Sequence, residues 1–232
     1  MLKEKKKYIS PVDLLVVAVI LFGEGIFNST LQCIGLFTQQ TSLAENLTFT
    51  ALDNIKALLI QLVWLSLALA YLIWRKVDIF QLTNRIFWTP WVPLQALLIF
   101  GLAAFCMDIF HLLTYQLTSP VMPSMFNLLP HIDITLLAYS LLNGFYEEIF
   151  FLGLCFMNKP EESKWILPFS LLVRASFHTY QGLVAGIGLG LIVGLLFHFL
   201  YQKRQPRNLL PFFLAHSLAD VIGLTILSYL LY

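Results

Sequence analysis

Three stretches rich in ionisable residues interrupt the most apolar part of this chain, and their residue types are those of a hydrolytic site. The stretches are YEEIFFLG at residues 146–153, RASFHTYQG at residues 174–182 and AHSLAD at residues 215–220. A charged side chain is costly to hold in hydrocarbon, so such residues normally face the interior of a helix bundle and mark a functional site. The sequence therefore predicts a polar site inside a membrane.

Two adjacent carboxylates, two histidines and an aspartate supply the candidate chemistry, and one arginine supports them. The candidate catalytic residues are Glu147, Glu148, His178, His216 and Asp220, and the supporting residue is Arg174. A glutamate can take a proton from water, and a histidine can donate one to a leaving group or an oxyanion. Two histidines and a glutamate are also a common zinc ligand set, with Glu147, His178 and His216 as candidate ligands. The sequence leaves open whether a divalent metal such as zinc takes part, but both mechanisms are hydrolytic.

The composition predicts an integral membrane protein. The chain has 232 residues, of which 59% are hydrophobic and 12% charged, and its mean hydropathy is +0.79. Soluble domains are usually about 45–50% apolar and about 25% charged. We expect one membrane domain over residues 1–232, with the motif-bearing core at residues 133–232. The formal charge of +1 and the lack of a basic patch argue against a nucleic-acid partner, and the apolar composition implies contact with the lipid bilayer; a protein or peptide substrate is implied only by the resemblance described below.

Apolar runs predict an all-α fold, a polytopic bundle of about seven transmembrane helices. They lie at roughly residues 12–37, 52–75, 91–116, 133–157, 165–179, 183–201 and 208–232, and the fifth is short for a span. Lysines and arginines occur before the first run and after the second, fourth and sixth, whereas the alternate loops have none. The positive-inside rule then predicts a cytoplasmic N-terminus and a C-terminus outside.

Helical spacing and depth predict that the polar residues meet. Arg174 and His178 are four residues apart, as are His216 and Asp220, so each pair shares a helix face. All the candidate site residues fall near mid-membrane when depth is counted along their spans at about 1.5 Å per residue. Glu147 and its neighbour point about 100° apart, which implies different roles for the two carboxylates.

Several neighbouring features have mainly structural interpretations. Glycines recur every fourth residue from 182 to 194, which indicates close helix packing. The turn at residues 180–182 should lie below the outer surface and form a cavity wall. Glu24 either lines this cavity or bonds a neighbouring helix, His111 and His198 are interpreted as interhelical hydrogen-bond donors, and Asp108 is left out of the site because it lies closer to the outer surface.

Over roughly residues 90–232 the motifs resemble those of the CPBP intramembrane proteases, the family of type II CAAX prenyl endopeptidases and bacteriocin-processing proteins. Glu147 and Glu148 stand at the paired glutamates, His178 at the histidine of the second motif, and His216 with Asp220 at the third. Because members often have eight spans, the resemblance allows an eighth here. It also implies an integral protein of a bacterial cytoplasmic membrane.

Two positions depart from the family pattern. Leu152 stands where the family usually has an arginine, and Arg174 stands where the second motif usually begins with phenylalanine. A guanidinium lost from one helix and gained on the next could place the same charge beside Glu148, which would otherwise be an unpaired buried carboxylate. We expect Arg174 to replace the missing arginine.

The resemblance implies an intramembrane endopeptidase, a hydrolase often classed with the metalloproteases. Glu147 and His178 would activate water, and His216 with Asp220 would polarise the scissile carbonyl. The alternative is a catalytically idle relative, an immunity or regulatory protein that binds a bacteriocin or a sensor protein, and the absent arginine favours it. A proton-coupled transporter is a third function, disfavoured because the chain shows no paired halves or inverted repeats.

Overall fold

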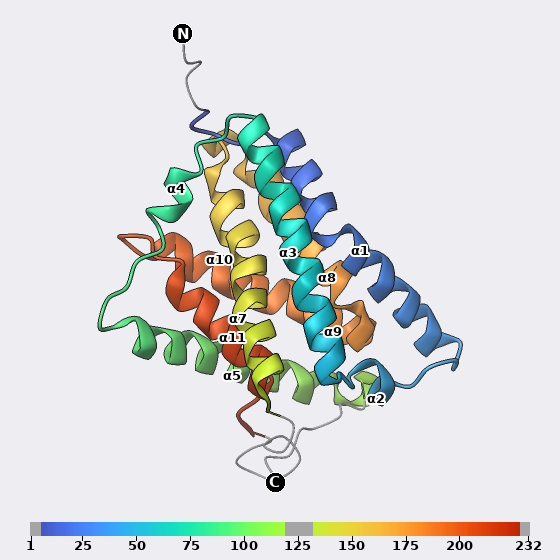
Figure 1. The fold of residues 1–232 in the computed structure, drawn as a ribbon. Helices are drawn as coiled ribbons and strands as arrows, with labels where there is room; N and C mark the ends of the chain where they lie inside the picture. Colours follow the sequence, from blue (N-terminus) through green and yellow to red (C-terminus); the bar gives the residue numbers. More distant parts are fainter. Residues whose placement is uncertain (1–5, 119–131, 228–232) are drawn as a thin grey trace.

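The computed structural model describes residues 6–118 and 132–227, and in this part of the chain helices are joined by turns and loops, with no β-strand (Figure 1). The α-helices are α1 Pro11–Phe37, α2 Leu43–Asn46, α3 Ala51–Trp74, α4 Phe80–Thr83, α5 Val92–Thr118, α7 Ile134–Glu148, α8 Ser163–Phe177, α9 Leu183–Gly188, α10 Gly194–Lys203 and α11 Leu210–Ile222. Two π-helical turns, η2 Ile149–Gly153 and η6 Leu189–Val193, continue α7 and α9. Short 3₁₀ turns are η3 Leu154–Met157, η4 Pro160–Glu162 and η5 Thr179–Gln181. The all-α bundle expected from the sequence is confirmed.

Five of the predicted spans are helices long and apolar enough to cross a membrane. They are Pro11–Phe37, Ala51–Trp74, Val92–Thr114, Ile134–Met157 and Leu183–Lys203. Their starts carry the expected signals: Ser10 caps α1 ahead of Pro11, Thr50 and Asp53 form a capping box on α3, and Asp133 caps α7. The fifth predicted span is the short helix α8, as its length suggested.

The seventh predicted span, at residues 208–232, is wrong as a single helix. Helix α11 ends at Ile222 because Gly223 adopts a φ of 79°, a left-handed conformation that ends helices. The buried carboxylate of Asp108, on α5, then accepts the backbone N–H groups of Ile226 and Leu227 at 2.8 and 3.0 Å. Asp108 thus has a structural role that its position in the sequence did not reveal. Residues 228–232 of the predicted span lie outside the described residues.

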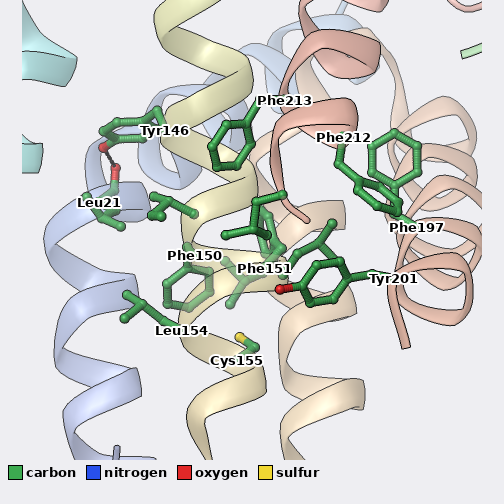
Figure 2. Packing of buried hydrophobic residues seen from close by; sticks show 14 of the residues in the cluster. Leu21, Tyr146, Phe150, Phe151, Leu154, Cys155, Phe197, Tyr201, Phe212 and Phe213 are labelled. Atoms are coloured by element: carbon green, nitrogen blue, oxygen red, sulfur yellow. Dashed lines mark hydrogen bonds between the residues drawn. The ribbon is translucent and has the colours of Figure 1, made fainter. Parts of the chain in front are cut away.

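The helices surround the segments that carry the motifs. Helix α7 packs against α3 and α11, α11 packs against α5, and α8 packs between α1 and the η6 turn. In Figure 1, α1, α3 and α7 slant down the bundle, while α5 runs across its lower part. Figure 2 shows part of the buried apolar core, which includes Phe150 and Phe151 of η2, Tyr201 of α10 and Phe212 of α11. The polar site thus rests on a packed apolar core.

Close packing of α8 on the α9–α10 segment follows the predicted glycine strip. A Cβ atom added at Gly190 would lie 2.4 Å from the Cβ of Ala175, and one added at Gly186 would lie 3.0 Å from the backbone of Thr179. At Gly194 the added atom would meet Leu171 at 2.7 Å. Glycines 186, 190 and 194 therefore face residues 179, 175 and 171 of the antiparallel neighbour in register, as expected for close membrane helix packing.

Gly190→Ala should destabilise the protein, because the new methyl group meets the backbone as well as the side chain of Ala175 and one helix must shift. Overpacking of this kind costs about 1–3 kcal/mol. Thermal unfolding in detergent measures the effect. The matched control is Gly101→Ala on α5, where an added Cβ atom meets nothing within 4 Å and stability should be unchanged or slightly raised. Equal stability of both variants would contradict the packing described here.

Candidate active site

The site forms where α7, α8 and α11 come together. Glu147 and Glu148 are the last two residues of α7, and the π-helical turn η2 follows them directly. Such turns are rare and frequently occur at functional sites. Gly144, one turn earlier, allows the close approach of α11, since an added Cβ atom would lie 2.4 Å from the carbonyl oxygen of Phe213. This approach brings the glutamates beside His216, which is on α11.

Glu148 is fully buried and has its hydrogen-bonding capacity taken up by two neighbours. Nη2 of Arg174 donates to both of its carboxylate oxygens, at 2.7 and 2.8 Å. Nδ1 of His216 lies 2.7 Å from Oε1 of the same carboxylate, and because a carboxylate accepts, the imidazole donates. The predicted compensation is therefore present: Arg174 supplies the positive charge at Glu148, and Leu152 is buried at 2% exposure in the apolar core.

Glu147 has a different environment, as the 100° separation indicated. It is 4% exposed, and its Oε1 accepts from Nδ2 of Asn143 at 3.1 Å. Nε2 of His216 lies 3.6 Å from that same oxygen. Its Oε2 is buried without a hydrogen-bond partner in the described part of the chain, and the closest cation is Nη1 of Arg174 at 3.9 Å. Both carboxylate oxygens of Glu148 thus accept hydrogen bonds, whereas Oε2 of Glu147 accepts none in the described part of the chain.

Asn143 is a site residue that the sequence analysis missed. Its Nδ2 donates to Glu147 and also to Oδ2 of Asp220, at 2.8 Å. Its Oδ1 accepts from Nε2 of Gln61, on α3, at 2.5 Å. Asp220 in turn places Oδ1 3.6 Å from Nε2 of His216. The sequence does place Asn143 four residues before Glu147, on the same face of a largely apolar helix. An asparagine alone, however, does not indicate catalysis.

His178 lies at the end of α8 and is held in one orientation. Its Nδ1 is 2.8 Å from the backbone carbonyl oxygen of Arg174. A carbonyl oxygen can only accept, so Nδ1 carries the proton and Nε2 of the neutral ring presents a lone pair. The ring stacks beside Phe177, with centroids 4.4 Å apart. The side chain faces the same cavity as Glu147 but is not among the closely clustered ligand atoms described below.

A cavity of about 800 Å³ reaches between α1, α3 and α5. Among the site residues, it is lined by Asn143, Glu147, His178, His216 and Asp220. Tyr180 and Gln181 line it, so the predicted cavity wall at this turn is confirmed. Glu24 lines the cavity as well, and its carboxylate accepts a hydrogen bond from Nε1 of Trp64, on α3, at 2.8 Å. The sequence offered two roles for Glu24, a cavity-lining residue or a bond to a neighbouring helix, and the structure shows both.

The two remaining histidines do not act as the interhelical hydrogen-bond donors that the sequence suggested. Neither forms a side-chain hydrogen bond within residues 6–118 and 132–227. His111 lies at the wall of the main cavity, and His198 packs against Phe156 with ring centroids 4.7 Å apart. Their contacts are therefore mainly those of packed rings.

A divalent metal fits the described carboxylates and imidazoles poorly. Ligand atoms of Glu147, Glu148 and His216 lie within 4.8 Å of one another. However, both oxygens of Glu148 are bonded to Arg174, and the guanidinium also lies near Glu147, so a divalent cation here would face a fixed positive charge. The candidate set of Glu147, His178 and His216 is not gathered, since His178 is outside this cluster.

Arg174→Leu should be severely destabilising, because it leaves the buried Glu148 without its cation. Breaking a buried ion pair costs about 3–5 kcal/mol. The double change Arg174→Phe with Leu152→Arg, which restores the usual family arrangement, should recover much of this loss. Thermal unfolding of Arg174→Phe, Leu152→Arg and the double variant, analysed as a double-mutant cycle, measures the coupling between the two positions. Lys203→Leu, at an exposed position of α10, is the control for loss of a positive charge, and simple additivity of the two changes would contradict the exchange of charges.

The comparison with protein-family models matches residues 130–222 to the type II CAAX prenyl endopeptidase Rce1-like family. Neither a search of curated proteins nor a search of solved structures found a match. The matched range contains all of the candidate catalytic residues and Arg174. The comparison thus confirms the resemblance that the motifs indicated: over residues 130–222 the chain is similar to the Rce1-like type II CAAX prenyl endopeptidases, a family of membrane proteases.

Proposed function

We propose that this protein hydrolyses peptide bonds of a membrane-associated protein or peptide, with Glu147 as the general base. The proposal rests on the difference in hydrogen bonding between the two glutamates. Glu148 is taken up by Arg174 and His216, whereas Oε2 of Glu147 is buried, lacks a hydrogen-bond partner in the described structure and belongs to a cavity-lining residue. A carboxylate held free beside a cavity is suited to accept a proton from water.

The proposed reaction begins with a water molecule in the cavity. The water gives a proton to Oε2 of Glu147 while its oxygen bonds the carbonyl carbon of the peptide. Nε2 of His178, which has no proton in the tautomer described above, accepts the second hydrogen bond of this water and orients it. The proton on Glu147 then passes to the leaving nitrogen as the carbon–nitrogen bond breaks, which yields a carboxylic acid and an amine. The acid then gives the second proton of the water to the amine or to solvent, so the final products are a carboxylate and an ammonium group.

His216 and Asp220 stand on the side where the carbonyl oxygen would develop charge. Nδ1 of His216 donates to Glu148, which fixes the ring, and in the imidazolium form its Nε2 donates toward the cavity. Asp220 is held by Asn143 and approaches the same nitrogen at 3.6 Å. Glu148 and Arg174 act through His216 and are positioning residues in this mechanism.

The geometry weakens the main argument for an idle relative. That argument rested on the missing family arginine, and Arg174 supplies an equivalent charge at Glu148. An immunity or regulatory role, in which the cavity binds a bacteriocin or a sensor protein without cleaving it, remains the alternative that the variants below separate from proteolysis.

Glu147→Gln and His178→Ala should each abolish processing while the protein remains inserted and folded. Loss of a proton-transfer group lowers the rate by about 10²-fold or more. Purified protein tested against a peptide library, with cleavage detected by mass spectrometry, measures the activity, and thermal unfolding confirms the fold. Glu161→Gln, an exposed carboxylate outside the cavity, should keep full activity. Full cleavage by both site variants would contradict the roles of Glu147 and His178, whereas no cleavage by the unchanged protein would favour the binding function instead.

We further propose that hydrolysis needs no divalent metal, because the guanidinium of Arg174 occupies the electrostatic role that a cation would have beside the two glutamates. Activity should survive dialysis against a strong chelator and should not increase on addition of Zn²⁺. The assay is paired with metal analysis of the purified protein. A loss of activity that Zn²⁺ restores would contradict this mechanism and would assign Glu147 and His216 as metal ligands.

A further inference from the structure

The cavity extends well beyond the catalytic residues along one polar face of α1. Glu24, Asn28 and Gln32 are spaced by four residues, so they share a helix face, and all three line the cavity. Polar residues of α3, Asn54 and Gln61, line it opposite them. A polar face on a membrane-spanning helix is tolerated where it borders a water-lined cavity. This extension has room for a substrate and is not needed for the hydrolytic step itself.

The described walls of this cavity carry an excess of negative charge. Four carboxylates, those of Glu24, Asp53, Glu147 and Asp220, line the cavity, against the cation of Arg174 and the imidazolium form of His216. The charge of Arg174 is already balanced by Glu148, which lies behind the wall. Carboxylates that line a low-dielectric cavity favour a cation inside it. The buried Oε2 of Glu147, which has no hydrogen-bond partner in the described part of the chain, belongs to a residue that lines the same cavity.

Glu24 is the carboxylate best placed to receive that cation. One of its oxygens accepts the indole N–H of Trp64 at 2.8 Å, and this is its only side-chain hydrogen bond within residues 6–118 and 132–227. Trp64 lies one helical turn beyond Gln61 on α3, and Gln61 bonds Asn143, which holds Glu147. The second oxygen of Glu24 therefore stays available at the wall of the cavity that Glu147 also lines.

We propose that Glu24 is a specificity-determining residue that binds a lysine or arginine side chain of the peptide substrate near the scissile bond. The inference rests on the proposed proteolytic function and names its substrate class as apolar membrane peptides that carry a basic residue. The indole N–H fixes the carboxylate, and the second oxygen accepts a charge-assisted hydrogen bond from the ammonium or guanidinium group. Asn28 and Gln32 offer amide groups to the peptide backbone alongside.

The test measures binding without cleavage, so that it does not depend on the activity. The Glu147→Gln protein in lipid nanodiscs is titrated with fluorescein-labelled apolar peptides that carry a single lysine at successive positions. Matched peptides carry leucine or glutamate at the same position. At one or two neighbouring positions we expect lysine to bind at least about tenfold more tightly than leucine, and glutamate to bind more weakly still.

Changing Glu24 to Gln in this background should abolish the preference for lysine, while leucine peptides bind as before. Glutamine retains an acceptor for the Trp64 N–H, so the fold is kept and only the charge is lost. Glu24→Asp should retain part of the preference, and Glu161→Gln should leave it intact. In the active protein, Glu24→Gln should raise KM for lysine peptides with little effect on kcat.

The outcomes separate this inference from the proposed function. Equal affinity for lysine and leucine peptides at every position, or a lysine preference that survives Glu24→Gln, overturns the role of Glu24 even if proteolysis is confirmed. A lysine preference that depends on Glu24, in a protein that cleaves nothing, supports the recognition site and overturns the proposed peptidase.

Discussion

The buried contact of Arg174 with Glu148 is the constraint on which the rest of the site depends. Each charge alone would be prohibitively costly to keep out of water, and the pair is acceptable because its geometry is good and its remaining hydrogen-bonding capacity is used. Nη2 of the arginine contacts both carboxylate oxygens, and the guanidinium lies 4.1 Å from the ring centroid of Phe151. With Glu148 held in this way, His216 has a fixed acceptor for its Nδ1.

The same contact separates two carboxylates that are adjacent in sequence. If both glutamates shared one arginine, neither would have a free oxygen at the cavity. Here the guanidinium lies close to Glu148 and stays 3.9 Å from Glu147. Glu147 is instead held through Oε1 by Asn143, and this amide also binds Asp220 and Gln61. The network ties α3, α7 and α11 together. Among its carboxylate oxygens it leaves Oε2 of Glu147 buried without a hydrogen-bond partner in the described part of the chain.

Such contacts require helices that approach unusually closely. Gly144 allows α7 to lie against the backbone of α11, and Gly190 allows the η6 turn to lie against α8. In a membrane there is little hydrophobic driving force between helices, so close packing of this kind supplies much of the association energy. The π-helical turns η2 and η6 both occur in the segments that border the site. Fold stability and site geometry therefore depend on the same few small residues.

The sequence by itself determined the class of the protein, most of its spans and the identity of the charged residues that meet. Hydropathy and charge are local properties, and residues four apart share a helix face whatever the surrounding fold. The pairing of Arg174 with Glu148 was predictable from the resemblance, because the family's arginine is replaced by Leu152 and a buried carboxylate needs a cation beside it. The family match over residues 130–222 agrees with this part of the prediction.

Only the tertiary structure decided how the polar groups share their partners. The unequal roles of Glu147 and Glu148, the bridging by Asn143 and the separation of His178 from the cluster depend on distances between helices, which no local pattern contains. Asp108 holds the segment after α11 through hydrogen bonds between residues more than a hundred positions apart in the chain. The physical reason is that hydrogen bonds are short-ranged and directional, so a shift of one helix by an ångström exchanges one partner for another, whereas burial of apolar surface tolerates the same shift.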